Sequence, residues 1–78
     1  MTEDRIFTRY KNRLMNEGTQ GQTRYNVVQY LCRGAGIDPV EMAAALIREG
    51  CYIAFDDSSI SQAENNANKK AVERLLRK

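Results

Sequence analysis

The 78-residue chain contains no histidine and no tryptophan, and it has only two cysteines and one proline. Histidine is the commonest general base and a frequent metal ligand, so its absence removes both roles. Two cysteines alone do not supply the four ligands of a usual zinc site. A cysteine nucleophile would also lack its activating base. We therefore expect a non-enzymatic protein that uses no metal and no cofactor.

Long apolar runs are missing as well. No run approaches the ~20 residues that a membrane-spanning helix needs, and no secretory leader precedes the first helical pattern. We expect a cytoplasmic protein that does not associate with membranes. In that compartment Cys32 and Cys51 are read as small buried hydrophobes, and a Cys32–Cys51 bridge is the alternative.

The length of the chain allows one domain, residues 1–78. Its apolar fraction of 42% and its charged fraction of 28% are typical of a folded rather than a disordered chain. A chain this short buries only ~60% of its unfolded surface. A homodimer interface is a common supplement to such a thin core.

Charge is segregated along the chain although the net charge is only +2. Residues 1–33 carry six basic and three acidic groups, residues 34–59 carry one basic and five acidic groups, and residues 60–78 carry five basic and two acidic groups. The mild total does not identify a nucleic-acid binder. The two basic ends are nevertheless candidate contact surfaces.

Apolar periodicity and capping residues predict four helices. The first covers about residues 3–16, with Thr2 as N-cap and two acidic residues in its first turn. The second begins after Thr19 or Thr23 and ends before Gly34. The third begins at the N-cap Asp38, with Pro39 at N1, and ends at Gly50 in the left-handed C′ position.

The segment 51–55 has the β-branched and aromatic content of a short extended run, followed by two turn-forming aspartates. A lone strand needs a partner for its backbone. We interpret this segment as a crossover that covers the core, and the alternative is pairing with the same segment of a second chain.

The fourth helix begins near Ser59 or Ser61, and both serines fit a capping box. Its predicted apolar face consists of Ile60, Ala63, Ala67, Ala71 and Leu75, widened by Val72 and Leu76. The expected fold is therefore all-α, a compact bundle of four short helices with one short extended segment at about residues 51–55 between the third and fourth helices.

Candidate partner-binding residues come from the two basic ends. Arg5, Arg9 and Arg13 step by four along the first helix and form a basic ridge, with Tyr10 beside it. Arginine and tyrosine are enriched among binding hot spots. In the fourth helix, polar and basic side chains could contact a nucleic acid or a protein. These are Gln62, Asn65, Asn66, Lys69 and Lys70.

The favoured hypothesis is a regulator or inhibitor that docks on a larger protein or nucleoprotein, of a size that compact phage and mobile-element genomes encode. The alternative is a small DNA-binding transcriptional regulator, dimeric, and a purely structural assembly subunit is a third possibility. A helix-turn-helix centred on residues 34–36 is only weakly indicated. The first turn of its recognition helix would place Asp38, Pro39 and Glu41 against phosphates.

A DNA titration separates the first two hypotheses. The DNA-binding hypothesis predicts saturable binding of a mixed-sequence duplex that weakens steeply with salt, because each phosphate contact releases condensed counterions. The protein-docking hypothesis predicts at most a weak signal at low salt. Fluorescence anisotropy at low and near-physiological salt measures the difference, and tight duplex binding at the higher salt would contradict the favoured hypothesis.

Overall fold

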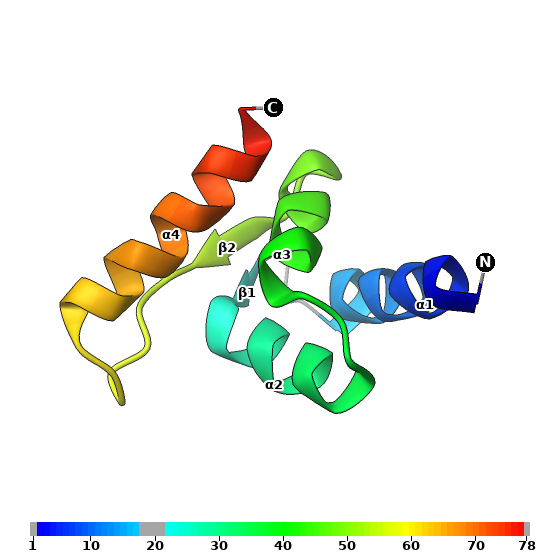
Figure 1. Ribbon diagram of the computed structural model, residues 1–78, viewed down its shortest axis with the longest axis horizontal. Helices are drawn as coiled ribbons and strands as arrows, with labels where there is room; N and C mark the ends of the chain where they lie inside the picture. The colour runs from blue at the N-terminus through cyan, green and yellow to red at the C-terminus, as the bar shows by residue number, and fades with distance from the viewer. Residues whose placement is uncertain (1, 18–21, 78) are drawn as a thin grey trace.

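The computed structural model describes residues 2–17 and 22–77, with side chains described for residues 5–16 and 22–77. The described chain is mostly helical and includes a small parallel sheet (Figure 1). In chain order the elements are α1 (Thr2–Glu17), β1 (Gln22–Arg24), α2 (Tyr25–Ala35), α3 (Pro39–Arg48), β2 (Tyr52–Ala54) and α4 (Gln62–Leu76).

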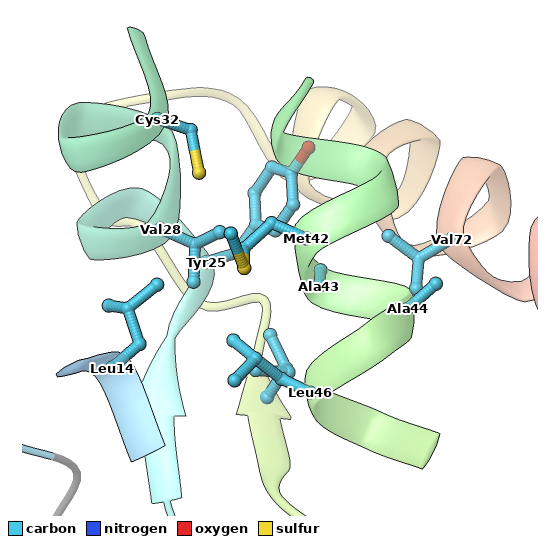
Figure 2. Packing of buried hydrophobic residues seen from close by; sticks show 10 residues of the cluster. Leu14, Tyr25, Val28, Cys32, Met42, Ala43, Ala44, Leu46 and Val72 are labelled. Atoms are coloured by element: carbon cyan, nitrogen blue, oxygen red, sulfur yellow. The ribbon is translucent and has the colours of Figure 1, made fainter. Parts of the chain in front are cut away.

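Helix α3 lies at the centre of the fold and packs against α1, α2, α4 and β2. Met42, Ala43, Ala44 and Leu46 are all fully buried. Figure 2 shows Met42 directed toward Val28 of α2, while Ala44 faces Val72 of α4. The remaining buried apolar side chains come from α1, α2, β2 and α4 and close around this helix; they are Leu14, Tyr25, Val28, Cys32, Ile53 and Val72.

The capping signals of α3 are confirmed. The Asp38 carboxylate accepts a hydrogen bond from the backbone N–H of Val40 at 2.9 Å, and Pro39 occupies N1. At the other end Gly50 has φ of 97°, and its N–H donates to the carbonyl of Ile47 at 2.9 Å. Such a left-handed residue suits glycine, which pays no Cβ penalty there.

The predicted end of the second helix, before Gly34, is wrong, because the helix is two residues longer. Helix α2 continues through Gly34 to Ala35, and Gly36 (φ 72°) takes the left-handed position. The Ile37 N–H then donates to the carbonyl of Cys32 at 2.9 Å. Both Gly34 and Gly36 fit the sequence signal for a helix end. The helix passes the first of them and ends at the second.

The start of the second helix is also different from the prediction, because residues 22–24 form a strand. Arg24 precedes α2 and provides no side-chain cap, and Thr23 lies within β1 rather than at a cap. The predicted Thr2 cap, the acidic first turn and Thr19 lie outside the described side chains.

The extended segment finds its partner within the same chain, which neither sequence interpretation anticipated. Strands β1 and β2 pair in parallel, with Gln22 opposite Tyr52, Thr23 opposite Ile53 and Arg24 opposite Ala54. Parallel strands need a long crossover, and here α2 and α3 supply it. The all-α prediction is therefore corrected to a mostly helical fold with a two-stranded parallel sheet.

Helix α4 begins where the Ser61 capping box predicts it, since the Ser61 hydroxyl accepts from the Glu64 N–H at 3.1 Å. The predicted apolar face is confirmed in the second half of α4, where Val72 is buried and Ala71, Leu75 and Leu76 are half-buried. It is wrong in the first half, where Ala63 and Ala67 are exposed and Asn65 is buried. Ala63 and Ala67 carry too little apolar surface to determine which side of the first turns is buried. The hydrogen bonds of Asn65 and the burial of Val72 determine it instead.

Two polar contacts tie the outer helices to α3. The Lys11 ammonium of α1 lies 3.0 Å from the Glu49 carboxylate, just after α3. The Arg48 guanidinium donates to the Leu75 carbonyl at 3.1 Å and so satisfies an acceptor in the last turn of α4.

Truncation of the central helix should be costly. Leu46→Ala removes a fully buried side chain, and we expect a loss of about 2–5 kcal/mol in the free energy of unfolding. Urea denaturation followed by circular dichroism measures it. Tyr52→Ala is the matched control, because Tyr52 is 65% exposed and should change stability by less than about 0.5 kcal/mol. A loss below about 1 kcal/mol for Leu46→Ala would contradict the central role of α3.

Candidate functional site

The outer face of α1 carries a row of exposed arginines. Arg5, Arg9 and Arg13, the arginine ridge, are all exposed, as the spacing of four predicts. Arg5 and Arg9 line a shallow hollow together with Thr8 and Asn12. Every charged side chain of α1 that the structure describes is basic.

The basic side chains of α1 differ in whether they interact with other residues of the chain. Lys11 is held by Glu49, and Arg13 also has an interaction within the molecule. Among the described side chains, none forms an ion pair or a hydrogen bond with Arg5 or Arg9. The guanidinium groups of Arg5 and Arg9 therefore keep their donors available to a partner.

Beside the ridge lies an open groove of about 1010 Å³, the α2 groove. Residues of α2 form its floor, including Gln29, Tyr30 and Arg33. Tyr10 and Arg13 of α1 line one side, and the opposite side consists of residues from the 57–60 loop and the first turns of α4. Figure 1 shows α2 between α1 and the start of α4.

The structure brings Tyr10 and Arg13 together with two side chains that were not among the predicted contacts, Tyr30 and Arg33. Tyr30 is 80% exposed. The sequence signal for Tyr30 is indirect, because helical periodicity puts it at the edge of the apolar face formed by Val28 and Cys32.

Asn65 is a predicted contact residue, but its side chain is only 5% exposed. It makes hydrogen bonds within the chain instead. Its amide nitrogen donates to the Asp57 carbonyl at 2.9 Å, and its amide oxygen accepts from the Asp57 N–H at 3.2 Å. Asn65 thereby fixes the loop that forms one side of the α2 groove.

The same loop is held by Asp57 itself. Its carboxylate accepts from the Ser59 hydroxyl at 2.6 Å and from the Ser59 N–H at 2.9 Å. These hydrogen bonds stabilise the ionised form and lower the pKa of the Asp57 carboxyl below its ordinary value. The loop therefore presents a negative charge at neutral pH.

The other predicted residues of α4 lie away from the arginine ridge. Gln62, Asn66 and Lys69 border a second groove of about 500 Å³ between α4 and β2, and Lys70 is exposed on α4. Helices α1 and α4 stand on opposite sides of α2 and α3 (Figure 1). The two basic ends of the sequence do not combine into one surface.

The weak helix-turn-helix interpretation is not supported by the placement of α3. The recognition helix of such a motif must present one face to the DNA major groove. Helix α3 instead buries four of its ten residues completely and is covered by α1, α2, α4 and β2.

Both cysteines are free thiols. Cys32 is fully buried, and burial together with the nearby Asp38 carboxylate raises the pKa of its thiol to about 11. Cys51 is half-buried beside β2. Among the described side chains no group of three or more Cys, Asp and Glu residues comes together as a metal site, and none of the described helices has the length and hydropathy that a bilayer crossing requires.

Comparison with protein-family models, with characterised proteins and with solved structures gives no match. The interpretation of the arginine ridge and the α2 groove therefore depends on their own residues.

Removal of the Asn65 amide should loosen the groove. Asn65→Ala deletes both hydrogen bonds to the part-buried backbone of Asp57 and removes the partner of the Asp57 N–H, so we expect a loss of about 1–3 kcal/mol in stability. Chemical denaturation measures the loss. Asn66→Ala is the matched control, since Asn66 is an exposed neighbour. Equal stability of the two variants would contradict the clamp.

The two thiols should differ in reactivity. Because the thiolate is the reactive form, Cys32 should resist a thiol reagent at pH 8 in the folded protein while Cys51 reacts. Raising the pKa on folding also means that Cys32 stabilises the fold fully below its unfolded pKa and loses that contribution as the pH rises toward 11. Labelling of Cys32→Ala and Cys51→Ala separates the sites, and fast labelling of Cys32 would contradict its burial.

Proposed function

We propose that the protein is a non-enzymatic regulator or inhibitor that docks on an acidic surface of a larger protein through the arginine ridge. The observation that carries this proposal is the exposure of Arg5 and Arg9 on one face of α1, where no described acidic side chain pairs with them. A fold that needed these cations for stability would hold them as it holds Lys11.

The chemistry of the ridge fits carboxylates. Each guanidinium group presents planar, paired donors that match a carboxylate in bidentate fashion. Tyr10 lies at the edge of the ridge and lines the α2 groove together with Arg13. A tyrosine between arginines supplies contact area with little loss of side-chain entropy. The partner surface is thus expected to be rich in Asp and Glu.

The distribution of charge supports a protein partner over a DNA duplex. A duplex binder presents its basic groups on one face, so that several phosphates are contacted together. Here Lys69 and Lys70 lie on α4, across the molecule from the ridge (Figure 1). The ridge alone is short, as a patch that meets a local acidic cluster can be. Binding of a duplex is the competing outcome of the titration described above.

Charge reversal of the ridge tests the proposal. Arg5→Glu/Arg9→Glu/Arg13→Glu should weaken binding to the physiological partner by at least about 30-fold, since a single hot-spot residue is worth about 2 kcal/mol. The partner is identified by affinity capture with the wild-type protein, and its affinity for both forms is then measured by calorimetry. Circular dichroism checks that the helical content is unchanged.

Lys69→Glu/Lys70→Glu/Arg74→Glu is the matched control, because it makes the same change in net charge on the exposed side of α4. This variant should bind within about threefold of the wild type, as expected for charges outside the interface. Equal affinities of the ridge variant and the wild type, or a greater loss in the control, would remove the ridge from the proposed function.

A further inference from the structure

The charged side chains that line the α2 groove are segregated by sign. Its charged lining consists of two basic and two acidic side chains, Arg13, Arg33, Asp57 and Glu64. The arginines lie toward the C-terminal end of α2, where α1 is adjacent. The acids belong to the loop and to the start of α4, next to the N-terminal half of α2, as Figure 1 shows for these elements. The lining as a whole is neutral.

The floor of the groove carries a protruding side chain and a gap one turn apart. Tyr30 is 80% exposed, and Gly34 follows four residues later on the same helix. A Cβ at Gly34 would meet no atom within 4 Å, and its φ is not positive, so the chain itself does not require glycine there. Glycine within a helix costs about 1 kcal/mol relative to alanine. No close approach of another part of the described chain explains this cost.

We propose that the α2 groove is a homodimer interface in which two copies pack α2 against α2 in antiparallel orientation about a two-fold axis. A two-fold interface is self-complementary when the positive part of a surface and its negative part exchange places under the rotation. The α2 groove has this property, because an axis through the middle of α2 brings the Arg13–Arg33 end of one copy over the Asp57–Glu64 end of the other.

The positions along α2 fit such an axis at Tyr30. The two Tyr30 rings then meet at the centre of the interface, where a buried aromatic contributes most to binding. Gly34 lies one turn from the axis and lets the backbone of the second copy approach closely. Val27, which is 42% exposed, lies at the edge of the same contact and loses its exposed apolar surface.

This inference shares one residue with the proposed function, because Arg13 belongs to the arginine ridge and also lines the α2 groove. Arg5 and Arg9 lie outside the groove, so the dimer would present these two arginines twice, once on each copy. Two such pairs on one particle suit a partner with repeated acidic sites. Arg5→Glu/Arg9→Glu changes the ridge without changing the groove, and Arg33→Glu changes the groove without changing the ridge, so loss of partner binding and loss of the dimer are distinguishable.

A charge-swap experiment tests the dimer. Sedimentation velocity of the wild-type chain should show a mass that rises from 8.9 kDa toward twice that value over a concentration series reaching about 1 mM. Arg33→Glu and Glu64→Arg should each weaken the dimer at least about tenfold, because each places like charges opposite one another at both ends of the interface. The double variant Arg33→Glu/Glu64→Arg should restore the affinity to within about threefold of the wild type.

Two controls have the same charge changes outside the groove. Lys70→Glu reverses an exposed cation of α4, and Glu41→Arg reverses an exposed acid at the N3 position of α3, the position that Glu64 occupies in α4. Both should dimerise like the wild type. A wild type that stays monomeric over the whole series, single variants that dimerise normally, or a double variant that fails to recover would each overturn the proposed interface.

Discussion

Close packing around α3 is the constraint on which the other elements depend. Its alanines at 43 and 44 have no exposed surface, and this smallness lets the neighbouring elements approach the helix axis. Met42 and Leu46 fill the remaining space toward α2 and β2. Since a chain of this length has a thin core, the same few side chains must position α1, α2 and α4 at once. The arginine ridge and the α2 groove are consequences of that arrangement.

The parallel pair β1–β2 connects the two halves of the chain at the edge of this core. Ile53 is buried, and Phe55, just after β2, stacks on Tyr25 at the start of α2 with ring centroids 5.0 Å apart. The loop that follows is then fixed by Asn65, whose amide replaces backbone partners for Asp57. A polar side chain in the buried face of α4 is thus the reason that the groove has a rigid acidic side.

Local signals in the sequence predicted the four helices, the caps of α3 and the Ser61 start of α4, because these depend on residues within one turn of each other. The partner of residues 52–54 could not be found in the same way. A three-residue strand at 22–24 has no alternation long enough to recognise, and its pairing crosses two helices. The burial of Asn65 in the first half of α4 was missed because Ala63 and Ala67 suggested a different face. Asn65 is buried where it hydrogen-bonds the backbone of Asp57, a contact between separate segments that helical periodicity does not predict.

The candidate site likewise has one part that the sequence predicts and another that depends on tertiary packing. Exposure of Arg5, Arg9 and Arg13 follows from helical periodicity alone, so the ridge was predictable. That α4 lies across the molecule from the ridge, and that Tyr30 and Arg33 face Asp57 and Glu64 across one groove, depends on how α1, α2 and α4 are placed around α3. The fold uses Lys11 and Arg48 to tie its outer helices to the centre. Among the described side chains, Arg5 and Arg9 make no such contact, and these are the two arginines on which the proposed docking depends.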